Sequence, residues 1–153
     1  MADQARVEVI GDRELAAKLA ALSDAAAGAK LEAAVRAGAL LVQNAAKEKA
    51  PYRTGTLRRS IHTEIIEQRR NYAEATVGTD LVYAAQVEFG GTITPKKAKM
   101  LHWVDRETGQ DVFAHAVTQV ARPYLRPAFD ENADAAVQEM GDALREAVEG
   151  VTG

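Results

Sequence analysis

Alanine is the residue that most limits the folds open to this chain. There are 31 alanines among 153 residues, and aromatic residues make up only 5%. A core built from large side chains would therefore be thin, so helices have to come close together. The segment 29–49 has small residues in its apolar stripe, at Ala34, Gly38 and Ala39, and these allow another backbone to come close. The close neighbour that these residues admit is either another helix of the same chain or a second subunit.

Composition excludes several classes of protein. The length suits one domain, and a net charge of −3 argues against a general nucleic-acid coat or a polybasic membrane binder. With no cysteine, disulfide scaffolds, thiolate zinc sites and cysteine nucleophiles are excluded. No apolar run approaches the roughly 20 residues of a membrane span, and the N-terminus lacks a signal-peptide core. We therefore expect a soluble domain made in the cytoplasm.

Patterning along the chain predicts helices around a small antiparallel sheet. Leu15, Leu19 and Leu22 share a face at helical spacing, and Pro51 ends the following long helix. Alternation of apolar and polar residues marks the strands. In chain order, we expect a strand at 6–10, a helix at 13–22, a break at 23–28, a helix at 29–49, strands at 59–67 and 72–79, a helix at 81–89, strands at 100–104 and 112–117, and a helix at 127–148.

The predicted class is α+β in a single domain over residues 1–153. A small antiparallel sheet is flanked by a long helix in the N-terminal half and by a C-terminal helix. Residues 92–121 are expected to form an arm that ends in a protruding β-hairpin, with a six-residue loop at 105–110. The C-terminal helix is expected to bury a stripe of seven residues: Phe129, Ala133, Ala136, Val137, Met140, Leu144 and Val148.

Charge is distributed unevenly behind the small net value. Residues 47–70 carry a net +4, residues 96–127 a net +3, and residues 128–153 a net −6. One interpretation is a solvated surface of mixed charge. The other is complementarity between copies, since opposite patches on one chain can meet on two chains.

The search for catalytic groups identifies no active site. No histidines stand at the close helical spacing of a zinc motif, and neither Ser23 nor Ser60 lies in a nucleophile elbow. His102 and His115 could face each other across the hairpin, which leaves a small metal enzyme or hydrolase as a minor alternative. The acidic residues of 105–111 lack the spacing of a calcium loop. We expect neither a cofactor nor a metal.

Three segments combine turn residues with charged residues. They read Ala-Pro-Tyr-Arg-Thr-Gly-Thr-Leu-Arg-Arg-Ser-Ile at 50–61, Tyr-Ala-Ala-Gln-Val-Glu-Phe-Gly-Gly at 83–91 and Arg-Pro-Tyr-Leu-Arg-Pro-Ala-Phe at 122–129. In this order they resemble the motifs of the tail-component family of long-tailed bacteriophages, the gene-ten-product-like proteins. The likeness covers residues 30–148. The chain departs from the family pattern at Tyr124, where phenylalanine is common, and at Gly91, where threonine is common.

The resemblance implies a virion structural protein without catalysis, made in the bacterial host and located in the neck or tail. Such proteins form rings at the joint between the tail tube and the head connector, and six copies are expected here. The implied partners are the head connector or stopper and the tail terminator or tail tube, with genomic DNA nearby and no membrane. Tail completion, head–tail joining and tail termination stay open as roles.

Charged residues of the three motifs and of the arm are the candidate interaction residues. We predict that Glu88 forms an ion pair with one of the motif arginines, within or between chains. The complete candidate set is Arg53, Arg58, Arg59, Glu88, Lys96, Lys97, Lys99, Arg122 and Arg126.

A nucleic-acid-binding module is the alternative from another class. The basic segments 47–70 and 96–99 could hold phosphates. Against it stand the acidic net charge, the lack of an aromatic stacking platform and the absence of a recognition-helix pattern. Salt-dependent affinity for free DNA distinguishes the two hypotheses.

Overall fold

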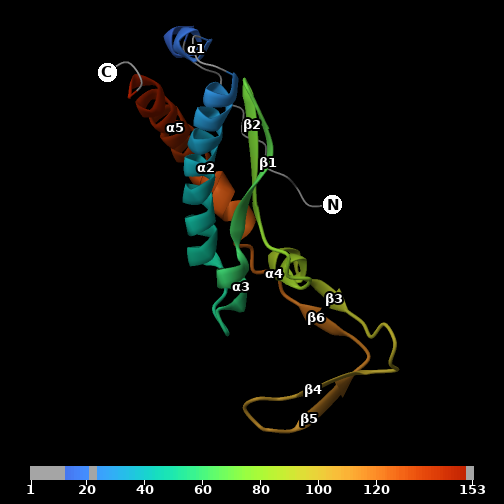
Figure 1. Ribbon diagram of the computed structural model, residues 1–153. Coiled ribbons are helices and arrows are strands. Elements are labelled where there is room, and N and C mark those ends of the chain that lie inside the picture. Colours follow the sequence, from blue (N-terminus) through green and yellow to red (C-terminus); the bar gives the residue numbers. More distant parts are fainter. Residues whose placement is uncertain (1–12, 21–23, 151–153) are drawn as a thin grey trace. The chain divides into compact units, whose positions relative to one another are not determined.

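The chain folds into helices and short antiparallel strands, as Figure 1 shows. The computed structural model describes residues 13–20 and 24–150. The fold is α+β, with long helices in the N-terminal half and at the C-terminus, as the sequence predicts. The elements are α1 (Arg13–Ala20), α2 (Asp24–Lys49), α3 (Thr56–Ser60), β1 (His62–Arg69), β2 (Tyr72–Gly78), α4 (Ala84–Phe89), β3 (Gly91–Ile93), β4 (Leu101–Val104), β5 (Asp111–Ala114), β6 (Val117–Gln119) and α5 (Leu125–Glu149). The strand expected at 6–10 lies outside the described residues.

Contacts within the chain divide it into two units. The first unit joins the residues up to Asp80 with those from Tyr124 onward, and the second unit is Leu81–Pro123. The expected arm at 92–121 lies inside the second unit. A single domain over 1–153 stays a prediction.

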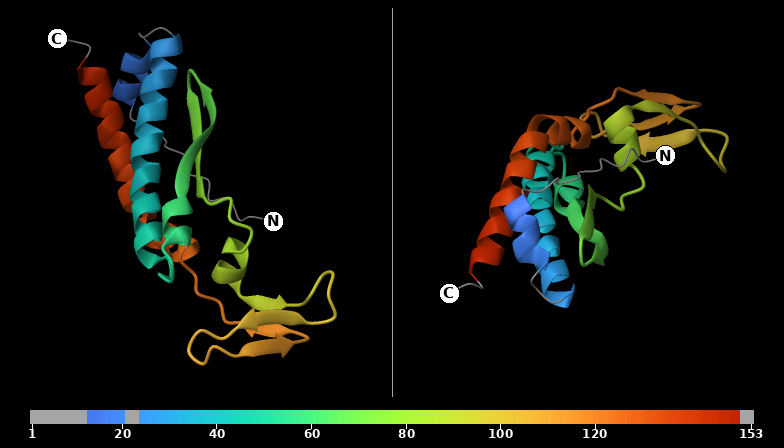
Figure 2. Two further views of the ribbon diagram at one scale, coloured as in Figure 1. Left: turned by 60° about the horizontal axis from the view of Figure 1, so that its bottom comes forward. Right: turned by 90° about the horizontal axis from the view of Figure 1, so that it is seen from above.

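In the first unit, α2 lies between α5 on one side and the β1–β2 hairpin on the other, and the views of Figures 1 and 2 agree on this. The two long helices run antiparallel. Near the start of α2, Lys30 donates a hydrogen bond to the carbonyl of Ala147, close to the end of α5. At the opposite end, Nζ of Lys49 lies 2.6 Å from Oε2 of Glu131. Both ends of the helix pair are therefore tied by lysines of α2.

The two long helices come very close together at Gly38. A Cβ atom placed there would lie 2.5 Å from Cε of Met140 and 2.7 Å from the carbonyl oxygen of Ala136. Only glycine fits at this position, because those distances are well inside van der Waals contact. The close neighbour expected from the small residues of α2 is thus a helix of the same chain.

Alanine dominates the core, because α2 is covered on two sides. The buried apolar residues of the described chain include few large side chains, of which Tyr124 and Ile61 are the largest that are fully enclosed. Those on the two long helices are Ala27, Ala34, Val35, Ala39, Val42, Ala46, Ala128, Ala136, Met140, Leu144 and Val148.

Two boundaries around α2 and β1 differ from the expectation. The break at 23–28 is wrong over 24–28, where α2 has already begun. Ala27 and Gly28 are buried there, and a Cβ on Gly28 would lie 3.2 Å from the carbonyl of Arg69, so packing stabilises this turn of helix. The strand expected from residue 59 starts at His62, because α3 occupies the preceding residues.

The β1–β2 hairpin follows the prediction in type and position. Its antiparallel register pairs His62 with Gly78 and Arg69 with Tyr72, which places the turn at residues 70–71. A bulge at Ile66 interrupts the register. The two strands form a sheet of their own in the described chain, with α2 against them.

The stripe expected on α5 is correct at four of its members and wrong at Val137. Ala136, Met140, Leu144 and Val148 are buried, whereas Phe129 and Ala133 are half-buried. Val137 is 39% exposed. The buried stripe winds slowly around the helix because four residues turn the chain through about 400°, slightly more than a whole turn.

The second unit holds α4 and two short ladders. β3 pairs with β6, and β4 pairs with β5 across the six-residue loop 105–110. The single strand expected at 112–117 is wrong in its extent, because a bend at 115–116 divides it between β5 and β6. The inner ladder β3–β6 was not expected from the sequence.

Candidate interaction surfaces

The first motif forms a tight loop and a helical turn beneath the end of α2. Gly55 has a φ of 73°, in the left-handed region that favours glycine, and it precedes α3. Arg58 on α3 donates from Nε to the carbonyl of Lys47 at 2.6 Å. That carbonyl belongs to the last turn of α2, whose oxygens have no partner inside the helix. Arg58, a candidate interaction residue, therefore caps α2 within its own chain.

The other arginines of this motif are exposed. Arg53 lies in the loop and makes no hydrogen bond or ion pair with the described residues. A Cβ on Gly55 would lie 2.8 Å from Nη1 of Arg59 and 3.0 Å from the ring of Tyr52. The guanidinium of Arg59 therefore covers the loop, and neither Arg53 nor Arg59 forms an ion pair with the described residues.

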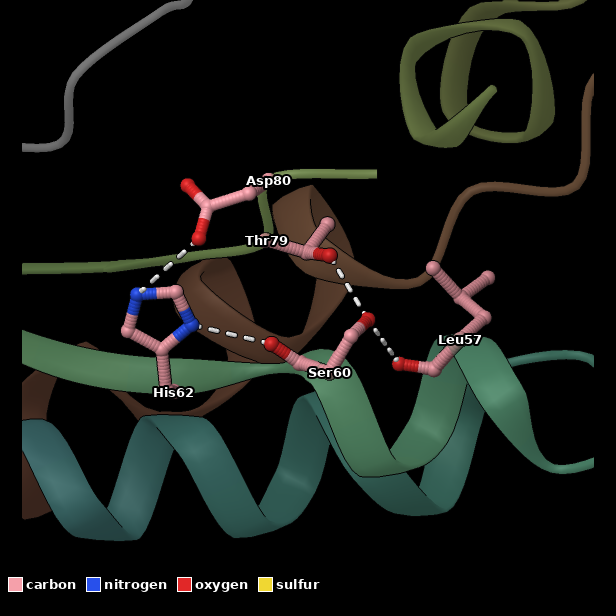
Figure 3. A network of polar contacts seen from close by, with 5 residues as sticks. All are labelled: Leu57, Ser60, His62, Thr79 and Asp80. Carbon is pink, nitrogen blue, oxygen red and sulfur yellow. Dashed lines mark hydrogen bonds and ion pairs between the residues drawn. The ribbon is translucent and has the colours of Figure 1, made fainter. Parts of the chain in front are cut away.

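A network of polar contacts joins α3 to the end of the hairpin (Figure 3). Oγ of Ser60 lies 2.8 Å from the carbonyl oxygen of Leu57 and 2.6 Å from Oγ1 of Thr79. A carbonyl oxygen only accepts, so Ser60 donates to Leu57 and the Thr79 hydroxyl donates to Ser60. The serine of the motif thus fastens α3 to the residue that follows β2.

Serine, histidine and aspartate meet in this network, but they are not arranged as a catalytic triad. Nδ1 of His62 donates to the backbone carbonyl of Ser60 at 2.9 Å, and Nε2 lies 4.0 Å from Oδ2 of Asp80. A nucleophilic serine needs its hydroxyl on the histidine nitrogen. Here the hydroxyl proton of Ser60 is directed at Leu57, so no base activates it.

The second motif forms α4 and a glycine stop. Gly90 has a φ of 68°, and a Cβ there would lie 2.6 Å from the backbone nitrogen of Ala121. The neighbouring backbone N–H of Arg122 donates to the carbonyl of Val87 at 2.7 Å. The motif therefore lets the returning strand pass directly over the end of α4. Glu88 is 7% exposed, and its pairing with an arginine stays a prediction.

The third motif opens α5. Tyr124 is almost fully enclosed at 2% exposed, so the aromatic ring is a core residue. Nε of Arg126 lies 3.8 Å from Oδ2 of Asp130 one turn further on, whereas the side chain of Arg122 is exposed. Pro127 stands in the first turn of α5, where its missing N–H has no helical partner to lose.

Charged side chains without partners occur in two places of opposite sign, on the segment 96–99 and on α5. Lys96, Lys97 and Lys99 are exposed and form no ion pair in the part of the chain that the structure describes. The same is true of three exposed carboxylates on α5, listed here from its N-terminal side: Asp134, Glu139 and Glu146. Other acids of α5 are paired, among them Glu131 and Asp142.

The outer hairpin of the second unit is amphipathic. Cross-strand pairs place Leu101 opposite Ala114 and Trp103 opposite Val112, so these four apolar side chains share one face. The other face carries His102, Val104, Asp111 and Phe113. This apolar face was not predicted from the sequence, although the alternation of residues 101–104 and 111–114 signals it.

The two histidines of the hairpin do not form a site together. His102 stands opposite Phe113, and the two rings are stacked with their centroids 4.7 Å apart. Nε2 of His102 lies 2.6 Å from Oδ1 of Asp111. His115 follows the end of β5, where Nδ1 donates to the carbonyl of Lys99 at 3.3 Å. The expectation that His102 could face His115 is therefore wrong. Across residues 13–20 and 24–150, no three metal-ligating side chains gather into a group.

Comparison with known proteins places the chain in a family. The observations above define a small α+β protein whose unpaired charges and exposed apolar residues point to binding other proteins. The model of the bacteriophage HK97-gp10 tail-component family matches residues 13–90, just over half of the chain. The chain belongs to this family of HK97-gp10-like phage tail components.

The match includes the first motif and the second motif up to Gly90, whereas the third lies beyond the matched residues, so its part in the resemblance stays a prediction. The search of curated proteins gave no match, and neither did the search of solved structures. None of the described helices has the length and apolar character needed to cross a membrane.

Proposed function

We propose that this chain is a virion structural protein at the head–tail joint, where identical copies assemble into a ring. Membership of the tail-component family is the observation that carries the proposal. The free lysines of the second unit and the free carboxylates of α5 support it, since a ring needs two unlike and complementary surfaces on each copy.

The role we propose is structural rather than enzymatic. The hydroxyl of Ser60 is directed away from His62, and the Asp105–Asp111 turn is closed by its own hydrogen bonds. The partners in this proposal are the head connector or stopper on one side and the tail terminator or tail tube on the other. Tail completion is the role we favour, with tail termination as the alternative in the same class.

Mass and symmetry of the purified protein test the ring directly. Sedimentation velocity and native mass spectrometry are expected to give one closed species, of six copies, and electron-microscopic averages should show matching rotational symmetry. A protein that stays monomeric up to about 100 μM, far above the dissociation constants of specific assemblies, overturns the proposal.

A nucleic-acid-binding module is the second candidate, favoured by the three free lysines at 96–99. Its test is a titration with double-stranded DNA at two salt concentrations. Contacts with several phosphates would weaken binding by about 10³-fold or more between 50 and 200 mM salt. Weak binding with a shallow salt dependence supports the joint protein instead.

A further inference from the structure

The second unit lacks a core of its own. Within Leu81–Pro123, all of which the structure describes, only Ala84 and Glu88 are buried. Of the twelve large apolar side chains that are exposed in the described chain, eight belong to this unit: Val82, Tyr83, Phe89, Met100, Trp103, Val104, Phe113 and Val120. An isolated two-stranded hairpin is only marginally stable in water, so such a unit needs a partner surface.

The hairpin offers one face that suits such a partner. We call Leu101, Trp103, Val112 and Ala114 the arm face, since β4 and β5 place all four on one side. Trp103 is 39% exposed, and the three smaller side chains are half-buried. Covering an aromatic side chain completely is worth about 2 kcal/mol, and tryptophan is enriched among the anchors of interfaces.

Charge around the arm face favours a protein over a nucleic acid. The free lysines Lys96, Lys97 and Lys99 precede β4, and we call them the arm lysines. Carboxylates Asp105 and Asp111 stand at the other end of the same hairpin. The pKa of Asp105 is lowered, chiefly because the backbone N–H of Thr108 donates to it, so this end is anionic and would repel phosphates.

The outer side of α5 has the complementary features. Its free carboxylates Asp134, Glu139 and Glu146 are exposed, and we call them the α5 acids. Val137 is the large apolar residue exposed on this helix. One turn away, a Cβ at Gly141 would meet nothing within 4 Å, so space for a side chain lies beside Val137. Asp134 lies on the same side of the helix as Val137, whereas Glu139 and Glu146 lie roughly 160–180° further around the helix axis.

We propose that the arm face and arm lysines of one copy bind the outer side of α5 in a second copy. Trp103 covers Val137 and Gly141, and the arm lies across the helix, so that the arm lysines, which precede Trp103 in the chain, pair with the α5 acids further around it. This inference rests on the proposed ring and names its subunit contact. The arm and the outer side of α5 are different surfaces. Every copy therefore uses its arm to bind one neighbour and its α5 to bind the other, as a closed ring of identical subunits requires.

Charge reversal in two separate variants tests the contact. Variant one carries Lys96→Glu, Lys97→Glu and Lys99→Glu, and variant two carries Asp134→Lys, Glu139→Lys and Glu146→Lys. Each alone should assemble at least about 100-fold more weakly, because like charges then face each other. An equal mixture should assemble again, since the reversed arm of the first meets the reversed α5 of the second.

The mixture also separates a contact between copies from one within a chain. An intramolecular contact would leave both variants defective after mixing, and that result overturns the inference. Circular dichroism and thermal unfolding of each variant verify that it is folded. If a variant is unfolded, the mixing is repeated with single reversals at Lys97 and Asp134.

The apolar part of the contact is tested with two aromatic residues of the same hairpin. Trp103→Ala should weaken assembly at least about 30-fold, the size expected for an interface anchor. Phe113→Ala is the matched control, because Phe113 is 60% exposed and lies on the opposite face of the hairpin. Its effect should stay below about 3-fold. Equal losses, or a larger loss for Phe113→Ala, overturn the choice of face.

The outcomes keep this inference separate from the ring itself. Wild-type protein that never assembles overturns both proposals. If the wild-type protein forms rings and every variant still forms them, only the contact proposed here is overturned. A Lys96/Lys97/Lys99 reversal that abolishes binding of free DNA but leaves assembly unchanged assigns the arm lysines to nucleic acid, and it overturns the inference in favour of the second candidate function.

Discussion

The two units differ in how far they bury their apolar side chains. The first unit places an alanine-rich helix between another helix and a hairpin, so that small side chains such as Ala46 and Ala136 are completely buried. The second unit has short ladders and a six-residue helix, and its large side chains, Trp103 and Phe113 among them, stay exposed. Large apolar residues are therefore least buried where they are most concentrated.

This difference indicates a division of labour. A core of small residues holds its helices at close range and stabilises the first unit without help. Exposed aromatic side chains gain their stabilisation only when another surface covers them. Under the proposed function, the first unit is the scaffold, and the second unit is the part whose stability would depend on assembly.

Hydrogen exchange gives the largest expected contrast between the two units. Below the concentration of assembly, backbone amides of α2 and α5 should exchange at least about 1,000-fold more slowly than those of β4 and β5. The helices open only when the unit unfolds, whereas the hairpin opens locally. Assembly should then slow exchange in β4 and β5. Equal protection of both units in the dilute protein would contradict the comparison.

Substitution of Gly38 probes the close contact of the first unit. Gly38→Ala should lower the free energy of unfolding by roughly 1–3 kcal/mol, because its Cβ collides with Met140 and Ala136. Urea unfolding measures the change. Gly141→Ala is the matched control on α5, where the new Cβ enters open space, and it should raise stability by about 0.5–1 kcal/mol. Stabilisation by both substitutions would refute the close approach at Gly38.

The cap on α2 should have a smaller effect. Arg58→Ala removes the hydrogen bond to the carbonyl of Lys47 and should destabilise the first unit by about 1 kcal/mol. Arg53→Ala serves as the control, because Arg53 has no partner among the described residues. Thermal unfolding of both variants decides the point. Equal melting temperatures would mean that the Arg58 cap contributes nothing.

The smallest and most local effect concerns the tip of the hairpin. Oδ1 of Asp105 accepts hydrogen bonds from the backbone N–H and the hydroxyl of Thr108 and from the N–H of Glu107, which lowers its pKa from the ordinary 3.8. A lowered pKa stabilises the folded turn above pH 3.8, and this contribution is lost as the pH falls through the folded-state pKa.

Titration of the Asp105 carboxyl by NMR should therefore give a value below 3.8. Amide exchange at Thr108 should accelerate in Asp105→Asn at neutral pH, while exchange in α2 stays unchanged. A carboxyl that titrates at or above its ordinary value would show that the turn does not depend on this side chain.

Patterns of neighbouring residues predicted the elements whose signals are local. The turn between β1 and β2, the end of α2 before Pro51, the short helix α4 and the stop at Gly90 all follow the expectation. Prediction failed where distant contacts overrode local preference. The start of α2 is helical because Gly28 packs on the end of β1.

For the candidate interaction residues too, the sequence predicted some properties and not others. Their exposure is predictable from charge, as the arm lysines show. Arg58 caps its own chain instead of standing free, and Glu88 is buried, because the elements around them are brought together by tertiary contacts. No pattern of neighbouring residues contains that information.

The sequence by itself determined the α+β class, the segments of charge and the motifs that resemble the tail-component family, because each depends on residues close together in the chain. Only the tertiary structure decided that Gly38 is a point of close contact between α2 and α5, and that the second unit leaves its aromatic side chains uncovered. Burial depends on residues that are far apart in sequence, and a one-dimensional pattern does not specify which of them meet.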